Sequence, residues 1–414
     1  MKPFLTIMTG LLVAGPLLHA RETRLLDGNL LLSLRAEAAR NHPAAKSAQL
    51  TATAAAGDAR VVRLWDDPMV GLSVMAASKD MRRDEGDLRV SFEQPLPKPG
   101  LFAANRAKAD ALQRAGQENS RSTSLETGAA AVRDAIELAL ADESVALQAA
   151  QVTWIESMVT NARQMAVNPD ATGLETLRLE SELARETQIL HAARRTRESL
   201  SQSLNLRLGR SLESPWPVLQ LPSAPLPVPV ASAEIARILQ VNPKVRSMRE
   251  MASAANAETR IADRDRAPQF ALSVDTDIYS GGDIRSASVG LKMSLPYFNR
   301  ASYDAKTEAS RLREKAAVKD IESTRLEIAS AVLAATTAAS NAAAQARAYS
   351  GEIHQRALQA SQAVEASWIS SKSPLTDLLE ANRQLFSIRL EQRRFIALQL
   401  AALEELNLLV PVRP

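Results

Sequence analysis

The chain has 414 residues and a net charge of +3, with 50 basic residues interspersed among 47 acidic ones, so it lacks the basic patch expected of a nucleic-acid-binding protein. It contains no cysteine, which excludes a disulfide framework, thiol chemistry and a lipid-modified N-terminal cysteine. Hydrophobic residues make up 46% of the sequence but aromatic residues only 4%, a composition typical of long, closely packed helices rather than of a thick globular core.

The first twenty residues have the pattern of a secretory signal peptide. Lys2 precedes an apolar run, Phe4–Leu18, and the segment ends at the small residue Ala20. We therefore expect residues 1–20 to be removed after export. The alternative, a buried N-terminal helix, is disfavoured by two glycines and a proline within the segment. No later apolar run has the length of a transmembrane helix.

The remaining chain contains a duplicated unit. Residues 67–74 (DPMVGLSV) and 267–274 (APQFALSV) share a proline and a closing Leu-Ser-Val at one fixed offset. Upstream, Pro43 and Pro243 each end a short helical segment, because the residue before a proline is disfavoured in the helical conformation. Residues 214–230 contain six prolines, which favour an extended connector, and the interleaved apolar residues indicate that it packs against another element. We predict a first structural repeat at 21–213, the connector at 214–230 and a second repeat at 231–414.

Each repeat contains two short segments in which apolar and polar residues alternate, the pattern of strands. One face of each strand is apolar, and the other carries charges that a packed core would not tolerate unpaired. This fits a transmembrane barrel, the alternative being a soluble four-stranded sheet on a helical layer. Four strands cannot close a barrel and open edges are not tolerated in lipid, whereas three copies give twelve strands and room for a bore. The predicted strands are 69–78, 87–95, 269–279 and 285–295, and the polar residues expected to line the lumen are Arg89, Glu93, Asp275, Asp277 and Lys292.

Each strand pair is followed by a long stretch without proline, residues 101–167 and 301–370, and then by a returning helix, residues 173–208 and 374–409. At 1.5 Å per residue each long helix would span roughly 100 Å, well beyond a globular domain. Apolar residues recur at 3–4 spacing along the returning helices, which predicts coiled-coil packing. The turns between paired helices are exposed tips where we expect partner contacts, the alternative being plain turns. The candidate tip residues are Asp170, Thr172, Gly173, Leu174, Lys372, Ser373, Pro374 and Leu375.

This arrangement of signal peptide, duplicated strand–strand–long helix–turn–helix units and proline-rich joint resembles the TolC-type outer-membrane efflux channels. The resemblance covers essentially the whole mature chain. Residues 295–303 (LPYFNRASY) look more like the heavy-metal efflux branch, the CusC/CzcC-like members, than like the multidrug branch. The motifs that carry the resemblance are Asn242-Pro243, the helix-to-strand prolines Pro68 and Pro268, residues 295–303 and residues 375–381 (LTDLLEA).

The resemblance implies a mainly α-helical fold with a small transmembrane β part. The chain would form a homotrimer, with a twelve-stranded barrel in the outer-membrane lipid of a Gram-negative bacterium and a long coiled-coil tunnel in the periplasm. It would be a passive exit duct for heavy-metal cations, delivered by an inner-membrane pump of the RND type through a periplasmic adaptor (membrane fusion) protein. The alternatives are a channel for drug efflux or type I protein secretion, and a periplasmic adaptor or coiled-coil scaffold. An adaptor normally has one long hairpin rather than two.

The resemblance also implies a constriction at the periplasmic entrance. Asp377 and Glu380 occupy the positions after the second helical turn where acidic residues narrow the family's entrance, and Trp368 is a further gate candidate. Converging carboxylates, one set per protomer, would attract cations and repel one another unless paired with Arg or Lys. The alternative is that they are solvated acids favoured at a helix N-terminus. Thr176 and Ser371 stand where the family often has an acid and a glycine, so we expect the gate to depend on the second repeat.

No catalytic, cofactor-binding or metal site is expected. The sequence has no phosphate-binding glycine loop and no histidine pair at metal-ligand spacing. Outside the predicted signal peptide the histidines are His42, His191 and His354, scattered along the chain. We therefore predict no enzymatic activity and no cofactor, and we expect selectivity to lie in the pump and the adaptor.

Overall fold

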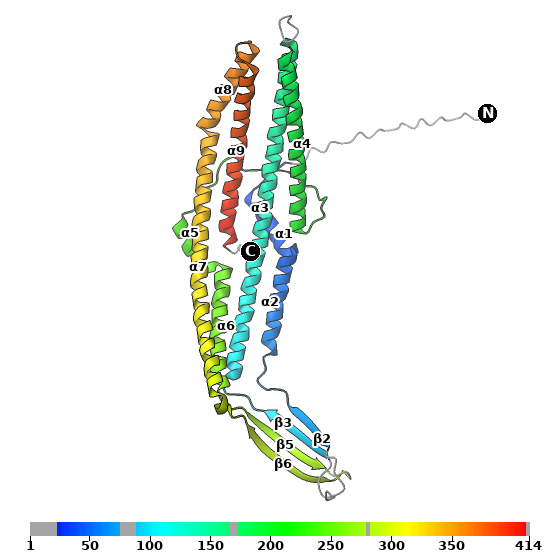
Figure 1. Ribbon diagram of the computed structural model, residues 1–414, viewed down its shortest axis with the longest axis vertical. Helices are drawn as coiled ribbons and strands as arrows, with labels where there is room; N and C mark the ends of the chain where they lie inside the picture. The colour runs from blue at the N-terminus through cyan, green and yellow to red at the C-terminus, as the bar shows by residue number, and fades with distance from the viewer. Residues whose placement is uncertain (1–22, 75–87, 166–172, 279–281, 411–414) are drawn as a thin grey trace, which may run out of the picture.

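The computed structural model describes residues 23–74, 88–165, 173–278 and 282–410. In this part of the chain a small sheet lies at one end of a long, narrow stack of helices, and two helical hairpins form the other end (Figure 1). The expected signal peptide lies outside the described residues. The helices are α1 (Gly28–Asn41), α2 (Pro43–Val61), α3 (Leu101–Met165), α4 (Leu174–Leu208), α5 (Ala231–Val241), α6 (Pro243–Asp265), α7 (Arg300–Ser350), α8 (Glu352–Ile369) and α9 (Leu375–Leu408), with the 3₁₀ turn η1 (Pro296–Asn299) before α7.

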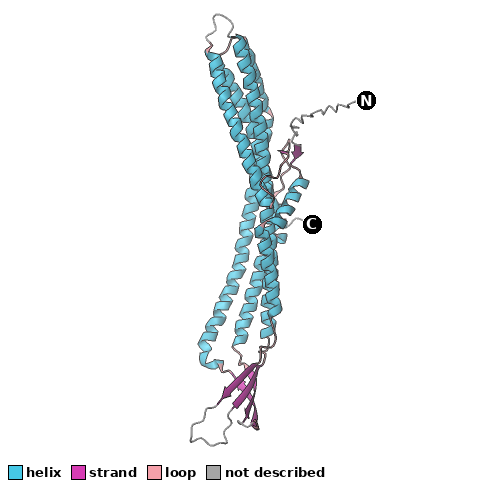
Figure 2. Cartoon of the chain, turned by 90° about the vertical axis from the view of Figure 1, so that its right-hand side faces the viewer, coloured by secondary structure: helices cyan, strands magenta, loops and turns pink. Residues whose placement is uncertain are grey.

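The long helices form one layer rather than a bundle around a central core. In the half next to the sheet they are packed in the order α2–α3–α6–α7, and in the far half α3 packs between α4 and α9, while α9 packs against α7 and α8 (Figures 1 and 2). A layer of this kind leaves the outer sides of its two edge helices without a neighbour. None of the described helices combines the length and the hydropathy needed to span a bilayer.

The main sheet repeats the order of the helices. Its strands are antiparallel in the order β2–β3–β5–β6. Each strand therefore continues the helix that precedes or follows it, and β2 and β6 are the two edges. Within the described residues neither edge strand has a partner on its outer side. The strands are β2 (Met69–Val74), β3 (Leu88–Pro95), β5 (Phe270–Ile278) and β6 (Ile284–Met293).

The two prolines between the short helices have equivalent surroundings. The residues before them, His42 and Asn242, have extended ψ angles of 131° and 126°, and the following helix begins at the proline. The side-chain amide of Asn41 donates to the carbonyl of Leu208 at 3.2 Å, and that of Asn242 donates to the carbonyl of Leu409 at 2.9 Å. Each bend is thereby tied to the end of the returning helix of its own repeat.

The connector packs against the middle of the layer, as its apolar residues predicted. Trp216, Leu219 and Leu221 are buried in a cluster with side chains of α1, α3, α4 and α9. The short strand β4 (Val218–Gln220) pairs in parallel with β1 (Thr23–Leu25). The connector is therefore an ordered segment packed on the helices and not a free linker.

The helix predicted over residues 301–370 is wrong in one respect, because it is divided into α7 and α8. The break lies at Gly351, whose φ and ψ of −94° and −120° are not helical. Glycine costs a helix interior about 1 kcal/mol relative to alanine. In α3, Gly116 and Gly128 remain helical, and a Cβ on each would lie 3.6 Å from Ala52 and 3.2 Å from Arg35. Gly128 therefore lets α1 pack closely, whereas the distance at Gly116 is an ordinary contact and Gly351 has no neighbouring helix of this kind.

Candidate functional site

The two faces of the main sheet differ in chemistry, because the strand register places like residues together. On one face most register partners are both apolar, such as Val70 and Phe92 or Val274 and Val289. Many of them are exposed, and Val289 on edge strand β6 retains 74% of its surface. A continuous apolar face of this kind needs an apolar environment outside the protomer.

The opposite face brings together the five charged residues that were expected to line a lumen. Arg89 and Asp277 are register partners, and the guanidinium Nε lies 2.8 Å from the carboxylate. Lys292 reaches across β5 to form an ion pair with Glu93. It can do so because Ala271 and Ser273, which lie between them in the register, are small. Asp275, on the same face, completes the set. The location of this face inside a bore stays a prediction.

Near the hairpin ends, the gate candidate Trp368 is a packing residue within the protomer. It is 1% exposed and lies in a cluster with Ile155, Leu179 and Leu378, which come from α3, α4 and α9. Its indole N–H has no hydrogen-bond acceptor among the described residues. The side chain holds the two hairpins together, and a role in a gate stays a prediction.

The two candidate gate acids lie at the start of α9. Asp377 and Glu380 are both exposed and are three positions apart, so they lie on the same side of the helix. Neither forms an ion pair with a basic residue in the part of the chain that the structure describes. Their exposure leaves the carboxylates accessible to a neighbouring molecule. It is equally compatible with solvated acids at a helix N-terminus.

The candidate tip residues divide into exposed and buried members. Leu174, Lys372 and Pro374 are exposed, Gly173 and Ser373 are half-buried, and Leu375 is buried in the same cluster as Trp368. Asp170 and Thr172 lie outside the described residues. The surface available to a partner is therefore centred on the three exposed residues rather than on Leu375.

The geometry of the second turn explains why glycine suits its first position. Ser371 has a φ of 56°, and among the described residues no other non-glycine residue has a positive φ. Glycine adopts this left-handed conformation without steric cost. The equivalent turn of the first repeat ends at Gly173, with a φ of 63°.

A polar network between the hairpins was not predicted from the sequence. Glu182 of α4 accepts hydrogen bonds from Arg185, at 2.6 Å, and from Arg383 of α9, at 2.8 Å. The bond from Arg185 is the main reason why the pKa of Glu182 is lowered. Nearby, the buried amides of Asn382 and Gln151 are joined at 2.9 Å. The Glu182–Arg185 spacing of three is a visible signal of a helical pair, but Arg383 is 201 positions away.

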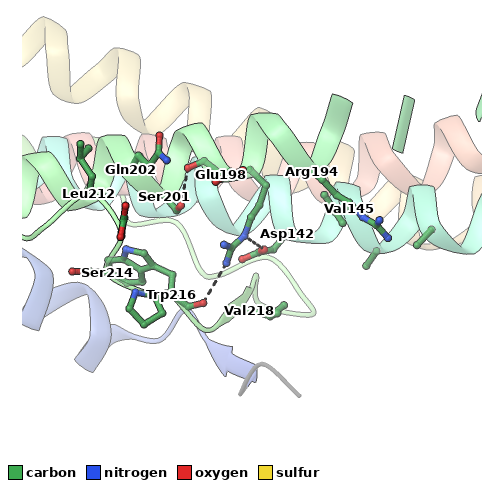
Figure 3. Close-up of a pocket in the computed structure, with 15 residues that line it drawn as sticks. Asp142, Val145, Arg194, Glu198, Ser201, Gln202, Leu212, Ser214, Trp216 and Val218 are labelled. Carbon is green, nitrogen blue, oxygen red and sulfur yellow. Dashed lines mark hydrogen bonds and ion pairs between the residues drawn. The ribbon is translucent and has the colours of Figure 1, made fainter. Parts of the chain in front are cut away.

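The connector is held at a cleft of about 660 Å³ between α3, α4 and the chain around Trp216 (Figure 3). Arg197 is buried and its Nε donates to Asp142 at 2.7 Å, while its terminal nitrogen donates to the carbonyls of Trp216 and Pro217. The second oxygen of Asp142 accepts the backbone N–H of Leu219 at 2.9 Å. Prolines cannot donate backbone hydrogen bonds, so these side chains take over the role that regular secondary structure has elsewhere.

The deepest polar groups of this cleft are thus already satisfied within the protein. Trp216 donates its indole N–H to Asn205 at 2.7 Å, and Asn205 donates in turn to the carbonyls of Leu212 and Ser214. Among the described residues there is no group of three or more His, Cys, Asp or Glu side chains that could hold a metal ion. We interpret the cleft as the anchoring point of the connector.

Comparison with known proteins is consistent with this architecture. Residues 235–410 match the sequence profile of the family described as outer membrane efflux protein. The second repeat therefore carries the sequence pattern of this family. The match begins in α5 and ends just after α9, so it includes both strands of that repeat and its helices α7, α8 and α9.

Several solved outer-membrane proteins share the fold over nearly the whole chain. The outer-membrane channel OprN has a TM-score of 0.78 at 16% identity, covering 92% of this chain and 89% of OprN. VceC, an outer membrane protein from Vibrio cholerae, has a TM-score of 0.76 at 17% identity, covering 91% and 96%. CusC has a TM-score of 0.75 at 16% identity, covering 93% and 92%. No match was found among curated proteins.

The resemblance to the efflux channel family is confirmed by these findings. The first repeat, which the family profile does not reach, has the same order of elements as the second: two short helices, two strands, and a long hairpin. The expected fold, mainly α-helical with a small β part in duplicated units, is also confirmed. Closure of a barrel and assembly of a trimer stay predictions.

Proposed function

We propose that this protein is the outer-membrane channel of a tripartite efflux system and serves as a passive exit duct. The observation that carries the proposal is the single open layer, in which strands and helices have the same order and both edges lack a neighbour in the described chain. Because the four strands alternate in direction, β6 of one copy and β2 of the next would meet antiparallel. Three copies joined in this way make a closed ring of twelve strands, which leaves room for a bore.

The edge helices support the same closure. On α7, the exposed residues Leu312, Leu326 and Leu333 are separated by multiples of seven, the repeat of a coiled-coil seam. On the other edge, Leu50 and Val61 of α2 are exposed. In a ring, the exposed apolar residues of α7 in one copy would pack against those of α2 in the next. The result is a helical tunnel continuous with the barrel, extending from the outer membrane into the periplasm.

We further propose that the transported substrate is a heavy-metal cation. The support is the sequence of residues 295–303, which resembles the CusC/CzcC-like branch. CusC is among the similar structures, and its similarity is about the same as that of OprN or VceC. We assign substrate choice to an RND-type inner-membrane pump and a periplasmic adaptor, the latter meeting the exposed tips around Leu174 and Lys372.

Growth tests on a strain in which the gene is deleted show which class of substrate the channel transports. The deletion strain should become sensitive to at least one of copper, zinc or cobalt, because metal delivered by the pump has no exit. Drug panels and assays of secreted proteins address the two other cargoes of this fold. Unchanged metal tolerance with increased drug sensitivity would replace the metal proposal with drug efflux. Recovery of the protein as a soluble periplasmic monomer, rather than a heat-modifiable outer-membrane trimer, would exclude the channel itself.

If Asp377 and Glu380 narrow the periplasmic entrance, removing their charges should change the conductance of the channel. Replacing Asp377→Asn and Glu380→Gln should raise the conductance of the reconstituted channel roughly several-fold, because carboxylates held in a closed ring must pair with basic groups of neighbouring copies. Single-channel recording in planar bilayers measures this. Glu322→Gln, an exposed acid on α7, is the matched control and should leave conductance unchanged. Equal conductance in the double variant and the wild type would assign both acids to the solvated helix N-terminus.

A further inference from the structure

A second cleft, of about 710 Å³, lies about midway between the sheet and the hairpin ends, where α1 meets α2 and α5 meets α6 (Figure 1). Its wall is formed by α1, α2 and α3 of the first repeat and by α6 and α9 of the second. A cleft of this size with an apolar wall and a few polar groups is typical of sites for small organic molecules. The apolar residues of the wall are Leu32, Ala36, Ala39, Ala45, Leu125 and Leu408.

Two of the three arginines that line this cleft already have a carboxylate partner. Arg35 of α1 binds Glu404 of α9 through two nitrogens, and its Nε donates to Oε1 at 2.8 Å. Glu404 is 2% exposed, so this pair is an internal contact between the two repeats. Arg121 pairs with Glu118, three positions earlier in α3. The charges of these four side chains cancel.

The third arginine, Arg246 of α6, has no partner of this kind. Its guanidinium forms neither an ion pair nor a hydrogen bond with any residue that the structure describes, although the side chain is half-buried. A charge that is partly removed from water is costly unless it is paired. With three arginines against two glutamates, the wall has one positive charge that is not balanced. The cleft therefore favours an anionic group beside Arg246.

Glu118 has the opposite requirement. Its Oε1 accepts a hydrogen bond from Arg121, but its Oε2 is buried and has no donor within the described part of the chain. Glu118 and Arg246 line the same cleft without forming an ion pair with each other. Buried acceptors are nearly always hydrogen-bonded in folded proteins. A molecule lying between these two side chains would satisfy both if it accepts from Arg246 and donates to Glu118.

We propose that this cleft binds a small organic acid with an N–H donor next to its carboxylate and an apolar body. Arg246 holds the carboxylate, because the planar guanidinium matches a carboxylate with two parallel hydrogen bonds. The N–H donates to Oε2 of Glu118, and the apolar body lies against the leucines of the wall. Acylated apolar amino acids are the simplest members of this class. The cleft is remote from the sheet and the hairpin ends, so binding there does not depend on closure of a channel.

Binding of N-acetyl-L-leucine to the full protein in nanodiscs tests the site. This probe has the carboxylate, the neighbouring N–H and an apolar side chain. Its dissociation constant is measured by ligand-detected NMR, and empty nanodiscs correct for uptake by lipid. Two analogues each lack one group: N-acetyl-L-leucinamide has no carboxylate, and 4-methylpentanoate has no N–H. We expect each analogue to bind about tenfold more weakly or less, because a hydrogen bond to a charged group is lost.

A matched pair of variants connects the binding to Arg246. Arg246→Gln should weaken binding of N-acetyl-L-leucine by about tenfold or more. Without the probe, its thermal midpoint should equal that of the wild type, because no ion pair is broken. Arg249→Gln, which removes an exposed arginine three positions along α6, should bind like the wild type.

Three results would overturn the site. They are the absence of saturable binding to the wild type, equal binding of either analogue, and undiminished binding to Arg246→Gln. None of these results bears on the channel, whose conductance and assembly are measured separately. A loss of channel activity would likewise leave the binding result unchanged.

Discussion

Cysteines placed on the two edge strands should cross-link neighbouring copies into a ladder that ends at a trimer. The variants combine Leu72→Cys in β2 with Ala287→Cys, Val289→Cys or Leu291→Cys in β6, all on the apolar face. The chain has no native cysteine, so every disulfide must join introduced residues. Within one protomer two strands separate β2 from β6, about 14 Å at strand spacing, which is beyond the roughly 7 Å limit for a disulfide. Non-reducing gels of oxidised outer membranes measure the products.

The control for this experiment replaces the edge residue of β2 with an interior one. Val90→Cys in β3 combined with Val289→Cys lies on the same face but has β5 between its two members, and it should remain monomeric. One of the three edge pairs should match the register between copies and cross-link with high yield. A ladder that ends at the dimer, or continues beyond the trimer, would contradict the twelve-stranded ring. So would the absence of products in all three pairs.

Breaking the buried ion pair between Arg197 and Asp142, beneath the connector, should strongly lower the free energy of unfolding. Arg197→Met leaves the carboxylate of Asp142 buried without its counter-charge, and removing one partner of such a pair costs about 3–5 kcal/mol. The side chains of Arg197 and Asp142 are only 9% and 5% exposed, so solvent cannot compensate. We expect a lower midpoint of urea unfolding and faster proteolysis within residues 214–230.

Two control variants test whether the unpaired buried charge causes the loss of stability in Arg197→Met. Arg163→Met breaks an ion pair with Glu180 that is exposed on both sides, and such pairs contribute at most about 1 kcal/mol. The double variant Asp142→Leu and Arg197→Met should be less destabilised than Arg197→Met alone, because no unpaired charge remains. If Arg197→Met were no less stable than Arg163→Met, the pair would not be what holds the connector.

The sequence predicted the regular elements well because their patterns are local. Alternation with period two identified the strands, and the prolines at 43 and 243 marked the bends between short helices. The break at Gly351 was missed because a single glycine does not by itself decide whether a helix continues or ends. Gly128 in α3 stays helical where its small size lets α1 pack closely, and that neighbour cannot be read from the local sequence.

The candidate functional residues were predicted well where their role follows from a local pattern, and poorly where it depends on contacts between distant segments. Alternation placed Arg89 and Asp277 on one face correctly, yet their pairing depends on the register between strands 188 positions apart. Trp368 was proposed for a gate, but the structure places it among side chains from three helices.

By itself the sequence determined the duplicated unit, the two faces of each strand and the length of the helices, since each follows from periodicity and from where proline stands. The tertiary structure decided what depends on contacts between distant segments: the single layer with matching strand and helix order, the ion pairs under the connector, and the network joining Glu182 to Arg383. Packing brings together residues that no local pattern relates. It is this packing that leaves the two edges of the layer open.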